Sequence, residues 1–312
     1  MSFRGCGVTG FSRPLHEGRV RPATLSGYQK ALLPFLAWAR SCAIPLSAPY
    51  QLDDALVVFA ELGKTTRSGF AALLSAIVFY MPRIKTGLAC AHATHAGWMR
   101  CDPVTHTRPM LRVFVLAIAV RLAAMGWPET GSALILGHIL LLRPSELLGA
   151  LVSDVTLPED APVFAGARKL FVALGPTPWG TKVNRRQVVS TADPFAIAAA
   201  RALVKHAPAA RRVCTWSYET HRRRLQKACK ALGFEDLVFT PHSMRAGGAT
   251  QMLMDGFPFD SIQQAGRWGS PQSCKIYLDA VYALAAGTAS RAKAFLPLLA
   301  LPALPPALGV ES

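Results

Sequence analysis

Residues 240–277 read TPHSMRAGGATQMLMDGFPFDSIQQAGRWGSPQSCKIY. His242 and Arg245 are three positions apart, so on a helix both side chains can point from one face at a single anion. A guanidinium offers a planar fork to two oxygens, and an imidazole exchanges a proton near neutral pH. Nine residues after Trp268, Tyr277 adds a hydroxyl that is a potential covalent nucleophile. The stretch therefore predicts an anion-binding site with nucleophilic chemistry.

The composition indicates a folded protein with a polyanionic partner. The chain has 312 residues, of which 51% are hydrophobic, so it suits two domains and is not globally disordered. Lysine and arginine number 34 against 18 acidic residues, which gives a formal charge of +16. This excess favours nucleic acid as the partner, ahead of an anionic membrane surface.

Cysteine spacing and hydropathy indicate the compartment in which the protein is expected. The seven cysteines are scattered without a C-x-x-C pair, which argues against a disulfide framework or a zinc site and favours a reducing compartment. No apolar run is long enough to cross a membrane, and the N-terminus lacks the apolar region of a secretory signal. We expect an intracellular protein without membrane contact, nuclear in a eukaryote and cytoplasmic in a bacterium or phage.

The N-terminal third predicts a helical domain. Residues 1–22 carry glycine, proline and arginine without periodicity and predict a flexible basic arm. Apolar residues then recur at three- and four-residue steps, and prolines and glycines separate the helical segments. Helices are expected over 23–39, 52–62, 68–80 and about 86–95. A linker over about 97–109 ends this domain, whose range is 23–103.

The remaining two-thirds predict helices around a small sheet, so the fold class is mainly α with a small β-sheet (α+β). Residues 169–174 and 187–190 have the alternating period of strands, joined by a turn region rich in glycine and proline. Residues 296–312 are a Leu- and Pro-rich tail that cannot form a regular helix. Helices are expected over 111–125, 131–142, 193–206, 220–232, 260–265 and 273–283.

Arg143 follows an almost wholly apolar run, where an unpaired guanidinium would be costly to bury. From the residues alone, an ion pair with Glu146 at the edge of the core is one interpretation. The other is a cation that faces a ligand.

Basic residues also gather in two further segments of the sequence, around residues 185–186 and over residues 222–230. They are either solvated surface or contacts with the DNA backbone. The candidates for DNA contact are Arg185, Arg186, Arg222, Arg223 and Arg224.

The segment 242–248, the Gly266-Arg267-Trp268 element and Tyr277 resemble the C-terminal signature of the tyrosine recombinases, the phage integrase family. The R-x-x-E element at 143–146 precedes them in the family's order. The resemblance covers about residues 105–285 by motif and 23–103 by length and helix count only. It implies a core-binding domain over 23–103 and a catalytic domain over 104–295.

The resemblance also implies a catalytic set, which is Arg143, Lys182, His242, Arg245, Trp268 and Tyr277. Glu146 would support the arginine pocket. Lys182 is the best-placed lysine on the predicted hairpin, although Lys169 competes, and an exposed lysine or a simple phosphate contact is the alternative. Tyr282 is the only nearby rival of Tyr277.

The function implied by the resemblance is a site-specific recombinase or integrase of a mobile element. It would cleave and rejoin double-stranded DNA through a 3′-phosphotyrosyl intermediate, as a homo-oligomer of two to four copies, with no metal and no cofactor. Three hypotheses stay open beside it. A catalytically inactive DNA-binding protein on this fold would form no covalent adduct, a type IB topoisomerase-like enzyme would relax supercoils without a specific site, and an unrelated basic scaffold would lack salt-dependent DNA affinity.

Overall fold

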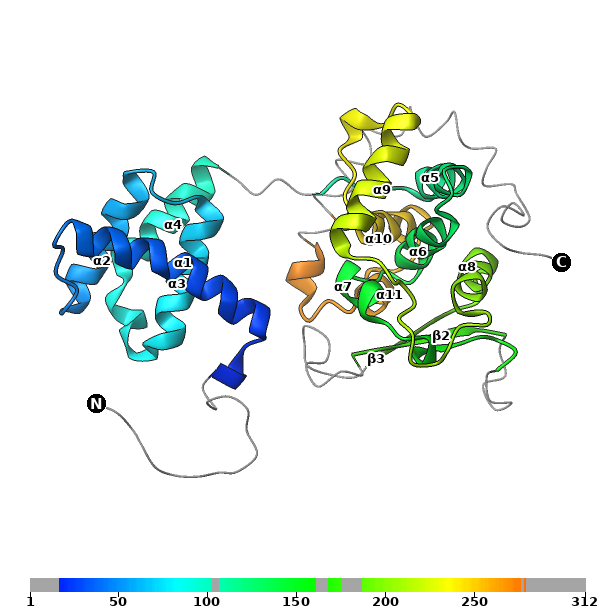
Figure 1. Ribbon diagram of the computed structural model, residues 1–312, viewed down its shortest axis with the longest axis horizontal. Helices are drawn as coiled ribbons and strands as arrows, with labels where there is room; N and C mark the ends of the chain where they lie inside the picture. The colour runs from blue at the N-terminus through cyan, green and yellow to red at the C-terminus, as the bar shows by residue number, and fades with distance from the viewer. Residues whose placement is uncertain (1–16, 103–106, 161–167, 176–186, 276–277, 279–312) are drawn as a thin grey trace, which may run out of the picture. The chain divides into compact units, whose positions relative to one another are not determined.

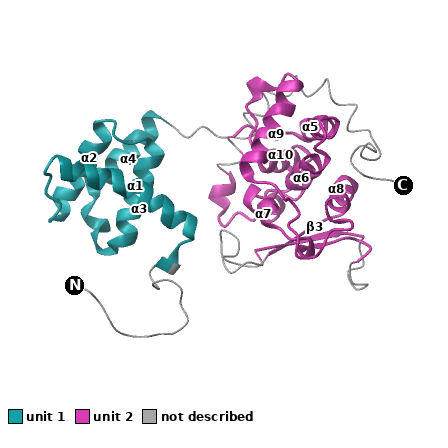
Figure 2. Ribbon diagram, in the orientation of Figure 1, with its two compact units in different colours: residues 1–105 teal, residues 106–312 magenta. Residues whose placement is uncertain are grey.

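The computed structural model describes residues 17–102, 107–160, 168–175, 187–275 and 278. The chain divides into two compact units, residues 1–105 and 106–312 (Figure 2). Helices dominate both units, and the strands found in the described residues all lie in the second (Figure 1). The prediction of a mainly helical chain with a small sheet is therefore confirmed. In the described part, no helix is both long and apolar enough to span a bilayer.

The first unit packs its helices around a core of aromatic and aliphatic side chains. Pro22 and Pro49 each occupy the first turn of a helix, where the missing N–H has no partner to lose, and the Thr66 hydroxyl caps the third helix. The largest core side chains include Phe35, Leu56, Phe70, Leu73, Ile77 and Leu88. The described elements are η1 (Glu17–Arg19), α1 (Pro22–Ser41), α2 (Pro49–Glu61), α3 (Arg67–Tyr80), η2 (Pro82–Gly87) and α4 (Ala89–Cys101).

The helix α4 is longer than its sequence predicted. The buried carboxylate of Asp53 accepts hydrogen bonds from the backbone N–H groups of Cys90 and Ala91, at 2.9 and 2.8 Å, and so caps the first turn. At the other end Trp98 packs against the core of the unit. The linker expected from residue 97 was therefore wrong for residues 97–101, because Trp98 anchors this last part of the helix to the core.

The second unit builds its helices around α5, whose residues from Val113 to Ala119 are all buried. The three strands among its described residues form an antiparallel sheet in the order β1-β2-β3, with Val172 opposite Val189, and α8 packs on β2. The predicted pairing of two strands is confirmed, and the short β1 adds a third. The described elements are α5 (Arg112–Ala124), α6 (Pro128–Ile139), α7 (Pro144–Gly149), η3 (Val152–Asp154), β1 (Val155–Thr156), β2 (Leu170–Leu174), β3 (Gln187–Thr191), α8 (Pro194–Val204), α9 (Tyr218–Ala231), η5 (Glu235–Leu237), α10 (Ser243–Met254) and α11 (Phe259–Gly266).

The helix α10 lies unusually close to its protein neighbours. A Cβ atom on Gly247 would overlap the carbonyl oxygen of Met110, and one on Gly248 would overlap the carbonyl oxygen of His138 in α6. The Met110 N–H also donates to the Ser243 carbonyl at 3.0 Å. The two glycines thus allow α10 to sit against α6 and the segment before α5, and this contact fixes the position of the α10 N-terminus.

We expect Gly247→Ala to destabilise the second unit by about 3 kcal/mol, because the new methyl group must displace backbone rather than a flexible side chain. Urea unfolding of the full chain, followed by tryptophan fluorescence, measures the change. Gly149→Ala is the matched control, because nothing lies within 4 Å of the added carbon there. Equal unfolding midpoints for the two variants would contradict this packing.

Two buried histidines couple the stability of the second unit to pH. Burial, with a smaller effect of Arg112, lowers the pKa of His138 to about 3. Burial, together with the charge of Arg224, lowers the pKa of His221 to about 4. The unfolded chain has the ordinary histidine pKa near 6.5, so below that pH it takes up protons that the folded unit does not. The free energy of unfolding is therefore highest above pH 6.5, and it decreases as the pH falls toward the folded-state pKa values of these two histidines.

Between pH 6.5 and pH 4 we expect each of these histidines to remove roughly 3 kcal/mol from the free energy of unfolding, as an upper limit. His138→Leu should flatten this part of the pH profile while leaving stability at pH 8 similar or higher. Urea unfolding at a series of pH values provides the measurement. An unchanged slope in His138→Leu would show that its protonation does not contribute.

Candidate active site

Arg143 stands at the start of α7, after three buried leucines, residues 140–142, that follow α6. The chain turns there because Leu141 adopts a left-handed conformation, with a φ of 51°, and Pro144 then begins α7. Arg143 Nη1 donates to Glu146 Oε1 at 2.5 Å, and the Arg143 backbone N–H donates to Oε2 at 2.8 Å. The predicted ion pair exists, and it leaves the Arg143 side chain 20% exposed.

Arg245 joins three separate segments at the first turn of α10. The residue is only 5% exposed. Its Nη1 donates to the carbonyl of Leu141, after α6, and its Nη2 donates to the carbonyl of Gly266, the last residue of α11. Its Cζ lies 4.7 Å from the centre of the Trp268 ring. The guanidinium is therefore held in one orientation between α6, α11 and an aromatic face.

The Gly266-Arg267-Trp268 element forms a tight turn at the end of α11. A Cβ atom on Gly266 would overlap the Trp268 ring, so a glycine is required beneath the indole. Arg267 is left-handed, with a φ of 55°, and this conformation reverses the chain. Trp268 is half-buried and packs against the small cluster that contains Leu141 and Ile262. The Trp268 ring is thus part of a small core and also lies against the Arg245 guanidinium.

Arg267 is the residue of this site to which the sequence alone assigned no role. Its side chain is 6% exposed, and its Nη2 donates to Glu146 Oε2 at 2.8 Å. The same guanidinium donates to the carbonyls of Leu141 at 3.0 Å and Ala265 at 3.1 Å. One indication of a role was present in the sequence, because Arg267 stands between the glycine and the tryptophan of the motif. Its partner Glu146 is 121 positions away, so their pairing could not be read from the sequence.

His242 directly precedes α10, one turn before Arg245. Loss of surrounding water, with the positive charges of Arg245 and Arg143, lowers the pKa of His242 below its ordinary value. The imidazole is therefore neutral near pH 7 and able to accept a proton. The charges of Arg245 and Arg143 both act on this imidazole.

The charges of the site leave a positive surplus. Burial alone would raise the pKa of Glu146, but Arg267 and Arg143 hold it below its ordinary value, so the carboxylate stays ionised. Glu146 pairs with Arg143 and Arg267, and Arg245 adds a third guanidinium that is bonded to carbonyl groups instead. An anion that gains charge during a reaction would be stabilised here.

Several predicted site residues lie outside the described residues. They are Lys182, Arg185, Arg186, Tyr277 and Tyr282. On either side of Tyr277, Cys274 and Leu278 are buried in the same cluster as Leu141. Burial raises the pKa of the Cys274 thiol, and the charge of Arg245 opposes this shift. The charge of Arg245 therefore reaches Cys274, three positions before Tyr277 in the sequence. Within the described residues, no group of three or more His, Cys, Asp or Glu side chains could hold a metal.

The basic face of α9 is not uniform. Arg222 and Arg223 are exposed. Arg224 instead lies between the rings of Trp127 and Trp216, at 5.5 and 5.3 Å, and donates to the Thr130 hydroxyl at 2.9 Å. Its guanidinium is therefore engaged inside the unit, a role that the run of three arginines did not reveal.

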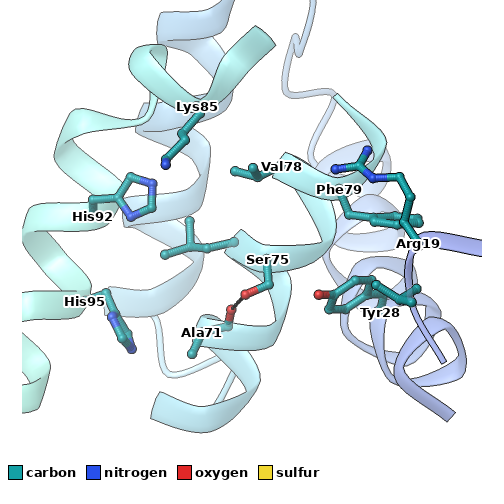
Figure 3. Close-up of a pocket in the computed structure, with 11 residues that line it drawn as sticks. Arg19, Tyr28, Ala71, Ser75, Val78, Phe79, Lys85, His92 and His95 are labelled. Atoms are coloured by element: carbon teal, nitrogen blue, oxygen red, sulfur yellow. Dashed lines mark hydrogen bonds between the residues drawn. The ribbon is translucent and has the colours of Figure 1, made fainter. Parts of the chain in front are cut away.

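The first unit carries a hollow of about 500 Å³ with a basic lining (Figure 3). Lys85 and His92 lie on one side of it, and Arg19 lies over the Phe79 ring on the other, 5.5 Å from the ring centre. The described lining residues include no aspartate or glutamate. The hollow therefore suits an anion, and the four groups Arg19, Lys85, His92 and His95 are accessible to it.

Comparison with known proteins assigns a class to this arrangement. The phage integrase family matches residues 132–283, a range that contains Arg143, Arg245, Trp268 and Tyr277. No characterised protein matches the chain in sequence. The fold and family are those of a tyrosine-type DNA recombinase. Residues 132–283 thus match the phage integrase family.

Solved structures of recombinases resemble the chain at low identity. The integrase of transposon Tn1549, in complex with a circular intermediate DNA, is 14% identical, with 84% of this chain and 91% of that chain covered and a TM-score of 0.54. XerA recombinase is 16% identical, with coverages of 85% and 89% and a TM-score of 0.40. XerH site-specific recombinase, bound to its difH substrate, is 12% identical, with coverages of 73% and 74% and a TM-score of 0.44. The likeness to the Tn1549 integrase is one of fold.

Proposed function

We propose that this protein cleaves and rejoins double-stranded DNA at specific sites through a 3′-phosphotyrosyl intermediate on Tyr277. The observation that carries the proposal is one hydrogen-bonded network that links Arg143 to Arg245 through Glu146, Arg267 and the Leu141 carbonyl. His242 lies one turn before Arg245, and the segment that holds these residues matches the phage integrase family. This arrangement matches a phosphodiester, which carries one negative charge and gains more during attack.

The chemistry follows from the groups present. The Tyr277 oxygen would attack the phosphorus, and the bond from phosphorus to the 5′ oxygen would break as the new O–P bond forms. The neutral imidazole of His242 would take the phenol proton, and Lys182 would give a proton to the departing 5′ oxygen. The two arginines would neutralise charge on the non-bridging oxygens. Religation is the same sequence reversed, so it needs no added energy source.

The proposed reaction requires no metal and no cofactor. Two guanidiniums, those of Arg143 and Arg245, supply the charge stabilisation that a divalent cation supplies in other phosphoryl-transfer sites. Cleavage should therefore proceed unchanged in the presence of a chelator.

The covalent step can be tested on randomised DNA, so that no target sequence has to be chosen in advance. A duplex library that is randomised on both sides of a nick serves as a suicide substrate, because loss of the short strand prevents religation. Covalent complexes are captured under denaturing conditions and sequenced. A shared sequence among the captured strands is the expected result. The absence of any adduct would refute the proposed function. Adducts without a shared sequence, together with relaxation of supercoiled plasmid, would indicate a topoisomerase.

DNA contact is proposed to extend over both units. Residues 23–103 would act as a core-binding domain and 104–295 as the catalytic domain, with no role assigned to the tail 296–312. The proposed backbone contacts in the second unit are Arg185, Arg186, Arg222 and Arg223. Arg224 has partners inside the unit, so we expect its loss to affect stability more than binding.

We expect the basic hollow of the first unit to hold DNA phosphates. Replacing Arg19 and Lys85 together by alanine should weaken binding about tenfold and reduce the slope of log affinity against log salt by about 1 to 2. Fluorescence anisotropy on a fixed duplex at several salt concentrations measures both quantities. Lys64→Ala is the control, an exposed cation of the same unit outside this hollow. A double variant whose salt slope equals that of Lys64→Ala would contradict this role.

We also propose that the protein assembles on DNA as a homo-oligomer of two to four copies, inside a cell. Two strands of each duplex must be cut and exchanged, so more than one nucleophile is needed. Mass photometry of the protein with a captured target duplex should show complexes of two to four copies. A single copy per duplex at all concentrations would oppose it.

A further inference from the structure

Arg267 is expensive to bury, and stability does not explain it. Its side chain is 6% exposed, burial lowers the pKa of its guanidinium, and its main charged partner, Glu146, is equally buried. Replacing a buried ion pair by apolar residues of similar size is often neutral or stabilising. An arginine at this position therefore calls for an explanation beyond packing.

The first contact of Arg267 fixes Arg143. Both oxygens of Glu146 are in use, since Oε1 accepts from Arg143 Nη1 at 2.5 Å and Oε2 accepts from Arg267 Nη2 at 2.8 Å. Oε2 also accepts from the Arg143 backbone N–H. Without Arg267 the Glu146 carboxylate would lose its tie to the end of α11, and the Arg143–Glu146 pair would be free to shift as a unit.

The second contact of Arg267 fixes Arg245. The Leu141 carbonyl accepts from Arg267 Nη2 at 3.0 Å and also from Arg245 Nη1. Leu141 is in a left-handed conformation that is uncommon for a leucine, and such a conformation persists only where surrounding contacts enforce it. Arg267 thus holds in place the carbonyl against which Arg245 is oriented.

We propose that Arg267 is a positioning residue for both phosphate-binding arginines, acting through Glu146 on Arg143 and through the Leu141 carbonyl on Arg245. This inference rests on the proposed function, in which these two arginines bind the scissile phosphate. Arg267 itself contacts no DNA in this role, and it acts by keeping two guanidiniums fixed before the charge develops.

The test compares two substrates that differ by one charge. On a captured target site, the scissile phosphate is either a normal phosphodiester or a neutral methylphosphonate, in which a methyl group replaces one non-bridging oxygen. The single-turnover rate of adduct formation is measured for the wild type, Arg267→Met and Arg267→Lys. Arg121→Met is the control, because Arg121 is exposed on α5. Thermal unfolding is recorded for every variant.

Arg267→Met should cleave the phosphodiester about 100-fold more slowly than the wild type, but the methylphosphonate less than about fivefold more slowly. A purely structural role would slow both substrates equally. Arg267→Lys keeps a positive charge for Glu146 but lacks the planar guanidinium that also reaches the Leu141 carbonyl. Its rate of phosphodiester cleavage should therefore be about tenfold below that of the wild type. Arg121→Met should match the wild type on both.

Equal losses on both substrates, or no loss in Arg267→Met, would overturn this inference while the proposed function stands. A wild-type protein that forms no adduct would overturn both. If Arg267→Met unfolds, Arg267→Lys gives the same comparison between the two substrates, and the same equal-loss outcome counts against the inference.

Discussion

Tyr277→Phe will bind DNA with wild-type affinity and form no covalent adduct. The substitution removes one oxygen, which is the proposed nucleophile, and leaves the arginines of the site in place. The flanking residues Cys274 and Leu278 are buried in the same cluster as Leu141, and the substitution leaves both of them unchanged. The expected loss of adduct formation exceeds that of any other single substitution, because the Tyr277 oxygen is the atom proposed to bond to phosphorus.

The measurement pairs a denaturing gel, which reports the adduct, with fluorescence anisotropy, which reports affinity. Tyr282→Phe is the matched control and should retain adduct formation. If Tyr277→Phe and the wild type formed equal amounts of adduct, another residue would be the nucleophile.

Arg245→Lys should reduce the cleavage rate by about 1,000-fold, which corresponds to about 4 kcal/mol of transition-state stabilisation. The Arg245 guanidinium donates to the carbonyls of Leu141 and Gly266 and lies on the Trp268 ring, so its orientation toward an anion depends on several contacts at once. A lysine keeps the charge but has no planar fork to satisfy two carbonyls and a phosphate together. Single-turnover adduct formation gives the rate, and a thermal scan checks folding.

Arg112→Lys provides the matched control for this change. Arg112 is an arginine of the same unit, paired with Asp193 at 2.8 Å and stacked on Phe195. We expect it to cleave at close to the wild-type rate. Similar rates for Arg112→Lys and Arg245→Lys would remove Arg245 from the catalytic set.

Regular elements of this chain could be read from its sequence because their signals are local. The helix over 111–125 and the strand pair near 170–190 follow from periodicity, and the pairing of Arg143 with Glu146 follows from their spacing. The position of His242 and Arg245 at the start of one helix has the same origin. Each of these features involves residues within one or two turns or one hairpin.

The features that the sequence did not reveal depend on distant partners. The extent of α4 is set partly by Asp53, which lies 37 positions before the first N–H that it caps. The role of Arg267 depends on Glu146, and that of Arg224 depends on Trp127 and Trp216. Such contacts become visible only when the fold brings the segments together.

The central claim is that one phosphodiester is attacked by the Tyr277 phenol within a metal-free arginine site. The most direct measurement digests the DNA adduct, formed in the presence of a chelator, and identifies the modified peptide by mass spectrometry. We predict a single nucleotide-bearing peptide, with the linkage on Tyr277 and a 3′-phosphate attached. An adduct on any other residue, or an adduct that forms only when a divalent metal is supplied, would contradict this claim.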